Sequence, residues 1–140
     1  MKTALALVLL AQLVAPKGGL PQVMSAKFSS PSVKAGRKAD VTVSFNVING
    51  YKINRDPKVS LALTPVPGVM LEKKAIEASP VDPKAKDEYF VDLPTLKVSV
   101  TAARPGKYEL PGKLTYFFCN KADGFCSKQT VDVKIPLQVE

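Results

Sequence analysis

The sequence predicts an all-β sandwich built from two antiparallel sheets. Three features lead to this fold class: short runs in which every second residue is apolar, 12 prolines that interrupt these runs, and a length of 140 residues, which suits one domain. Prolines at this density favour strands and turns over long helices. Hydrophobic residues make up 46% of the chain, which is enough to build a folded core and argues against disorder.

Five segments carry the strand pattern, in which successive side chains face opposite sides. They span residues 39–47, 59–63, 96–100, 114–119 and 131–139. The side chains that this alternation directs into the core are Val41, Val43, Phe45, Val47, Leu61, Val98, Val100, Val131, Val133, Ile135 and Leu137. Five or more strands separated by such turns indicate a two-sheet, immunoglobulin-like architecture, although the chain lacks the Trp of antibody domains.

Proline and glycine set the limits of these segments. Pro65 ends the second segment, and the turn signal at 104–106 follows the third. Pro136 lies on the outward face of the last segment, which predicts an edge strand or a bulge because proline cannot donate to a sheet ladder. Residues 72–79 fit one or two helical turns, or a loop.

Residues 1–20 have the features of a secretory signal peptide. Met1 and Lys2 form a short positive start, an apolar stretch continues to Ala15, and Pro16 interrupts it. The stretch is too short to span a bilayer as a helix and fits a signal; the alternative is an ordinary buried helix or strand. We therefore expect a periplasmic or secreted protein with no membrane span after signal removal, and the cleavage site is left open.

Charge and composition exclude several classes of function. The formal charge is +8, but the basic residues are scattered rather than gathered on a stripe, so no nucleic acid is expected as a partner. A soluble basic surface is the simplest interpretation; an acidic partner or an anionic envelope surface is the alternative. The chain has no His, which excludes His-based metal sites and the Ser-His or Cys-His pairs of hydrolases. No cofactor is expected.

The only chemically distinctive feature is the pair Cys119 and Cys126. Asp123 and Gly124 between them are a turn-forming pair, so the cysteines are expected on the arms of a hairpin, near enough to bridge. In an exported chain such a pair favours a disulfide over free thiols. The bridge could be a structural staple or could exchange with other thiols, which nearby Lys residues favour. Two Cys without His make a poor zinc site.

The stretch 116–126, an aromatic strand followed by Cys, a polar loop ending in Gly-Phe, and Cys, resembles the active-site hairpin of one family. That family is the N-terminal periplasmic domain of the thiol–disulfide reductase DsbD. Residues 49–53 resemble its Gly-Tyr segment, and residues 87–90 resemble the acidic-aromatic loop that caps its cysteines. The resemblance assigns residues 23–140 to one immunoglobulin-like domain of this type.

The resemblance implies a module that relays electrons through a Cys119–Cys126 disulfide to or from a thioredoxin-like partner. The residues that it implies as cap or site lining are Tyr89, Phe90, Tyr51, Asp87 and Glu88. The alternatives are that the aromatic pair belongs to the core, that the tyrosine at 51 fills a turn, and that the acidic pair is a solvated loop face. The competing function is a non-catalytic interaction domain with a structural disulfide, so an enzymatic role as a thiol–disulfide oxidoreductase is left open.

Overall fold

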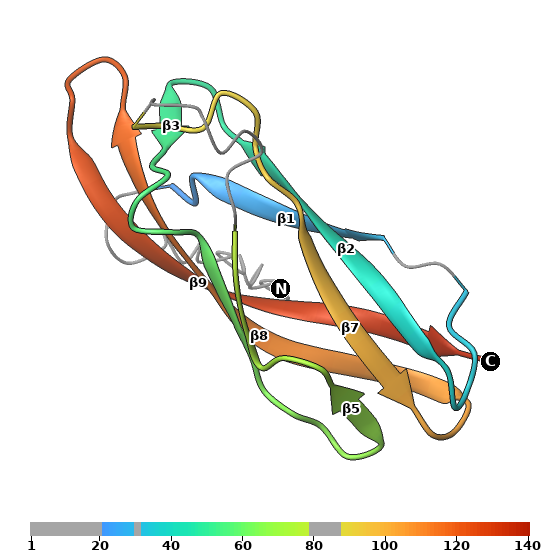
Figure 1. The fold of residues 1–140 in the computed structure, drawn as a ribbon. Helices are drawn as coiled ribbons and strands as arrows, with labels where there is room; N and C mark the ends of the chain where they lie inside the picture. The colour runs from blue at the N-terminus through green and yellow to red at the C-terminus, as the bar shows by residue number, and fades with distance from the viewer. Residues whose placement is uncertain (1–20, 30–31, 79–87) are drawn as a thin grey trace, which may run out of the picture.

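The computed structural model describes residues 21–29, 32–78 and 88–140. In these residues the chain forms nine strands and no helix, and the strands make two antiparallel sheets (Figure 1). The predicted immunoglobulin-like β-sandwich is therefore confirmed. The predicted signal peptide, residues 1–20, lies outside the described residues.

The first sheet has the strand order β1-β2-β7-β5. Its strands are β1 (Met24–Ser29), β2 (Lys38–Val47), β7 (Leu96–Ala102) and β5 (Val69–Leu71). The second sheet is built on a long hairpin, in which β8 pairs with β9 over the whole length of β9. β8 also pairs with β3 and β4, and β6 pairs with β4. Its strands are β3 (Tyr51–Ile53), β4 (Ser60–Leu63), β6 (Ala75–Glu77), β8 (Gly106–Asn120) and β9 (Cys126–Val139).

The five predicted segments correspond to β2, β4, β7, β8 and β9, but the last two strands are much longer than predicted. The predicted segment begins at residue 114, whereas β8 begins at Gly106 and continues through Pro111. The Pro111 carbonyl accepts a hydrogen bond from the Thr64 N–H at 2.9 Å, on the side away from β9. Since the N and O of one strand residue point to the same side, the missing proline N–H removes no bond from the β8–β9 ladder. The helical turn considered for 72–79 is replaced by β6 in the described part of that range.

The core lies between the two sheets and includes most of the predicted residues. Phe45, Val47, Val131 and Val133 are only half-buried, which corrects their prediction. Val131 and Val133 belong to β9, which pairs with β8 alone in the second sheet, and the residue opposite Val133 is Gly112, which has no side chain to cover it. The exposed Pro136 lies on this edge strand, as predicted.

A buried tyrosine joins the chain before and within β1 to the long hairpin. The Tyr116 hydroxyl accepts a hydrogen bond from the Met24 N–H at 3.1 Å and donates one to the Gln129 side-chain oxygen. That oxygen also accepts the Val23 N–H at 3.0 Å. Burial raises the pKa of Tyr116, so the neutral hydroxyl that this network uses is favoured in the folded state.

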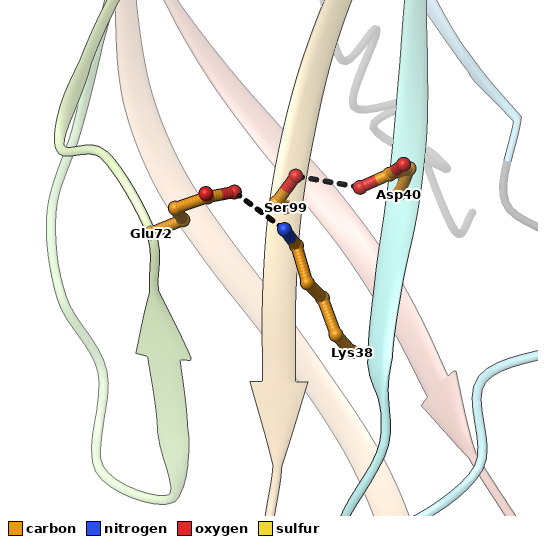
Figure 2. A network of polar contacts seen from close by, with 4 residues as sticks. All are labelled: Lys38, Asp40, Glu72 and Ser99. Atoms are coloured by element: carbon orange, nitrogen blue, oxygen red, sulfur yellow. Dashed lines mark hydrogen bonds and ion pairs between the residues drawn. The ribbon is translucent and has the colours of Figure 1, made fainter.

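The outer face of the first sheet carries a polar cluster from three parts of the chain (Figure 2). Lys38 Nζ lies 3.0 Å from Glu72 Oε2, and the Ser99 hydroxyl donates a hydrogen bond to Asp40. The hydrogen bond from Lys38 is the main cause of a lowered pKa of Glu72. Both partners of the ion pair are more than half exposed, so the pair adds little to stability, and what it adds is lost as the pH falls through that pKa.

Candidate functional site

The two cysteines form a disulfide at the closed end of the long hairpin. Cys119 lies near the end of β8, Cys126 begins β9, and the register places them directly opposite each other with their Cα atoms 4.0 Å apart. The sulfurs are 2.04 Å apart, so the predicted bridge is confirmed. In Figure 1 this end of the hairpin lies beside β3, away from the C-terminus.

The loop that joins the cysteines is held by its own polar side chains. The Asn120 side chain accepts the Ala122 N–H at 2.8 Å, and the Asp123 carboxylate accepts the Phe125 N–H at 2.9 Å. Gly124 has a φ of 73°, a left-handed conformation that suits glycine. The Asp-Gly pair therefore makes the turn that the sequence predicts, and the turn brings the two strands into the register that pairs the cysteines.

The two sulfurs lie in very different surroundings. Lys52 on β3, Cys119 and Cys126 form one row across three neighbouring strands, so their side chains share a face of the sheet. Phe118, which precedes Cys119 in β8, is buried in the core, so the cysteines and Lys52 face outward from the sheet. Cys119 is nevertheless only 2% exposed, whereas Cys126 on the edge strand is exposed.

Tyr89 covers the buried cysteine. Its hydroxyl lies 3.6 Å from Cys119 Sγ and donates a weak hydrogen bond to it, and Asn54 Oδ1 lies 3.5 Å from the same sulfur. The backbone around the tyrosine is tied to the chain after β3, because the Arg55 N–H donates to the Glu88 carbonyl at 2.9 Å and the Phe90 N–H donates to the Ile53 carbonyl at 3.0 Å. An isolated bridge between residues 54 and 89 lies between these two bonds.

The other residues implied by the resemblance lie in different places. Phe90 is half-buried and packs against the core, so it does not contact the sulfurs in the way that Tyr89 does. Tyr51 lies behind the disulfide row, where its ring meets the Phe118 ring edge-on at 5.7 Å between centroids. Glu88 is exposed, and its backbone carbonyl accepts the Arg55 N–H. Asp87 lies outside the described residues.

Two site residues were missed at the sequence level. Lys52 places its ammonium nitrogen 4.1 Å from the centroid of the Tyr89 ring, and Asn54 contacts the Cys119 sulfur. Both belong to the chain in and after β3, which reaches the cysteines only because β3 pairs with the end of β8. In the sequence, Lys52 and Asn54 alternate with Tyr51 and Ile53, which indicates that they share one face of a strand. This pattern does not show which other strand lies beside that face.

A groove of about 480 Å³ is lined by Tyr89 and Lys52, which contact each other beside Cys119, and also by Tyr51 and Phe90. Its walls combine apolar and basic side chains, and they also include Val91, Leu93 and Lys121. Val91 is 82% exposed, and Phe125 in the hairpin loop is 50% exposed. Exposed apolar side chains around a groove are typical of surfaces that contact another protein.

Comparisons with known proteins were made for the whole chain. No protein-family model matches the sequence, and no curated protein matches it. Among solved structures, one match is the crystal structure of the Neisseria meningitidis DsbD N-terminal domain in the reduced form. That domain is 17% identical to this chain, the match covers 79% of this chain and 84% of the domain, and the TM-score is 0.32. A likeness at this level does not align individual site residues, so the chemistry proposed below rests on the geometry of this chain.

In the part of the chain that the structure describes, no helix has the length and apolar character needed to cross a bilayer. The same residues contain no group of three or more cysteine or acidic side chains placed to hold a metal ion.

Proposed function

We propose that this protein is an exported thiol–disulfide exchange module that passes electrons through Cys119 and Cys126 to or from a thioredoxin-like partner. The observation that carries the proposal is the asymmetry of the bridge. One sulfur is on an exposed residue, and the other lies beneath a tyrosine that can donate a hydrogen bond to it. Exchange needs one sulfur that can be reached and another that can leave.

Reduction of the bridge follows from this asymmetry. A thiolate of the partner attacks Cys126 Sγ along the S–S axis, a new S–S bond forms between the two proteins, and the electron pair of the broken bond goes to Cys119, which becomes a thiolate and then takes a proton. A second thiol of the partner then loses its proton and attacks the partner's own sulfur in the mixed disulfide. This releases Cys126 as a thiolate, which takes up a proton. Two electrons and two protons have then passed from the partner dithiol to this protein, and the reverse sequence returns them.

Two groups beside Cys119 favour a leaving thiolate and act against its burial and the nearby Asn54 Oδ1. A hydrogen bond from the Tyr89 hydroxyl stabilises a charged sulfur more than a neutral one, and the Lys52 ammonium lies on the strand next to Cys119. A sulfur with a lower thiol pKa leaves faster in exchange. These two groups therefore support attack at Cys126 and departure of Cys119.

A purely structural role has less support. The bridge closes a short loop between strands that already pair along the whole of β9. Loop-closure reasoning assigns about 2.5 kcal/mol or less to such a crosslink, because closing a short loop removes little conformational entropy from the unfolded chain. The groove lined by Tyr89, its exposed Val91, and the exposed Phe125 next to Cys126 in the loop also support contact with a partner.

The test of this function is the equilibrium of the bridge with glutathione or thioredoxin. We expect a reduction potential above about −300 mV, in the range of exchangeable disulfides. Mass-resolved titration of the oxidised and reduced protein against either couple measures this value. A bridge that stays oxidised at potentials well below about −300 mV is a structural staple, and the interaction-domain function then replaces exchange.

Export is proposed from residues 1–20 and from the disulfide, since structural and exchanging bridges both persist in oxidising compartments. We expect the protein purified from its native host to begin after Ala15, so that residues 23–140 form the mature domain. Mass spectrometry of the intact protein measures this. Recovery of the chain with Met1 in a cytosolic fraction would contradict it.

A further inference from the structure

We propose that Lys52 is a positioning residue that holds the Tyr89 ring over Cys119 and thereby controls how readily that sulfur is reached. The inference rests on the proposed function, because it concerns the same disulfide. Lys52 acts on Cys119 indirectly, through its contact with the Tyr89 ring that covers this sulfur.

Lys52 lies beside both Cys119 and the Tyr89 ring. Lys52 lies directly opposite Cys119 in the β3–β8 register, so both side chains rise from the same face of the sheet. Its ammonium nitrogen is 4.1 Å from the Tyr89 ring centroid, well within the range of a cation–π contact. The hydroxyl at the other end of that ring reaches Cys119 Sγ. The ring is therefore held at its face by the lysine and at its tip by the sulfur.

The backbone around Tyr89 is fixed, which leaves only its side chain free to move. Residues 88 and 90 are each hydrogen-bonded to the chain at 53–55, and residue 89 forms a bridge with Asn54 between them. The Cα of Tyr89 is therefore anchored beside the disulfide. Uncovering Cys119 then requires rotation of the tyrosine side chain, and the contacts that oppose this rotation are those of the ring itself.

The cation–π contact of Lys52 can be distinguished from the effect of its positive charge on the local potential. Lys121 lines the same groove, so its replacement also removes one positive charge near the site. Within the described residues, the cation placed over the Tyr89 ring is Lys52. If the lysine acts by holding the ring, Lys52→Met and Lys121→Met will differ; if it acts only through the local potential, they will resemble each other.

The experiment measures alkylation of Cys119 by iodoacetamide in a Cys126→Ser protein, from about pH 6 to about pH 9.5, a range that spans the ordinary thiol pKa. Iodoacetamide is neutral, so lysine charge does not steer its approach. Each pH profile yields an apparent thiol pKa, which reports charge, and a limiting rate at high pH, which reports access. The same profile is measured after adding Lys52→Met, Lys52→Arg, Lys121→Met, or Lys52→Met together with Tyr89→Ala.

We expect Lys52→Met to raise the limiting rate about two- to five-fold, the population shift that follows from loss of one exposed cation–π contact. Lys52→Arg should restore the original limit, because a guanidinium also binds an aromatic face. Lys121→Met should leave the limit unchanged, and Lys52→Met should have no further effect once Tyr89 is Ala. An unchanged limit for Lys52→Met, or equal changes for both lysines, would overturn the proposal.

This outcome is independent of the test of the proposed function. The alkylation assay needs no partner and no disulfide, so a Lys52→Met protein with an unchanged rate would not alter the measured reduction potential of the native bridge. Conversely, if the bridge proves to be structural, Lys52 would have no role in exchange but would still affect the limiting alkylation rate.

Discussion

The thiol of Cys126 is expected to react about 5 to 30 times faster than the thiol of Cys119 when each is the only cysteine in the chain. Reaching Cys119 requires Tyr89 to swing away, which breaks one weak O–H···S hydrogen bond and one cation–π contact. Each is worth roughly 0.5–1 kcal/mol, and their sum corresponds to this ratio. Cys126 is exposed, so its thiol can be reached without such a movement.

The measurement compares Cys119→Ser with Cys126→Ser by alkylation at the high-pH limit, where both thiols are ionised. The same two proteins are then mixed with a thioredoxin that retains only its attacking cysteine and is activated as a mixed disulfide with an aromatic thiol. The Cys119→Ser protein should accumulate the inter-protein disulfide, and the Cys126→Ser protein should lag behind it. Equal rates, or faster reaction of Cys119, would reverse the assignment of the attacked sulfur.

Replacing Tyr89 by Ala in the Cys126→Ser protein is expected to raise the limiting alkylation rate of Cys119 by about the same 5- to 30-fold. The substitution removes the ring, its hydroxyl and the surface on which the Lys52 ammonium rests. Tyr89→Phe should raise the rate much less, because the ring and its cation–π contact stay in place. The alkylation rates of all three proteins are measured by quenching the reaction at set times and determining the modified fraction by mass spectrometry.

Phe90→Ala is the matched control for this prediction. Phe90 is the next residue and also aromatic, but it packs against the core. Its removal should lower the free energy of unfolding by about 2–3 kcal/mol, as for a large side chain that is only partly buried, without a comparable gain in alkylation rate. If Tyr89→Ala destabilises the protein in denaturant melts and leaves the rate unchanged, the tyrosine is a core residue rather than a cap.

The strand segments that the sequence predicted well are those in which the apolar residues of one face are fully buried. Val41 and Val43 in β2, and Val98 and Val100 in β7, alternate with polar residues because their strands lie side by side in the first sheet with one face on the core. β1 was not predicted, although its six residues alternate in burial. The strands β3, β5 and β6 were missed because each has three residues, too few to show a period of two. They form by pairing with longer strands, which is a tertiary effect.

The candidate site divides in the same way. By itself, the sequence determined the all-β class, the hairpin and the pair that bridges across it, since these depend on alternation, on the Asp123-Gly124 turn and on residues close in the chain. Only the tertiary structure decided that Cys119 is covered and Cys126 exposed. The cover comes from Tyr89, 30 residues earlier, and from β3, which pairs with the end of β8. Local patterns record which residues can face outward, but not which distant segment will pack over them.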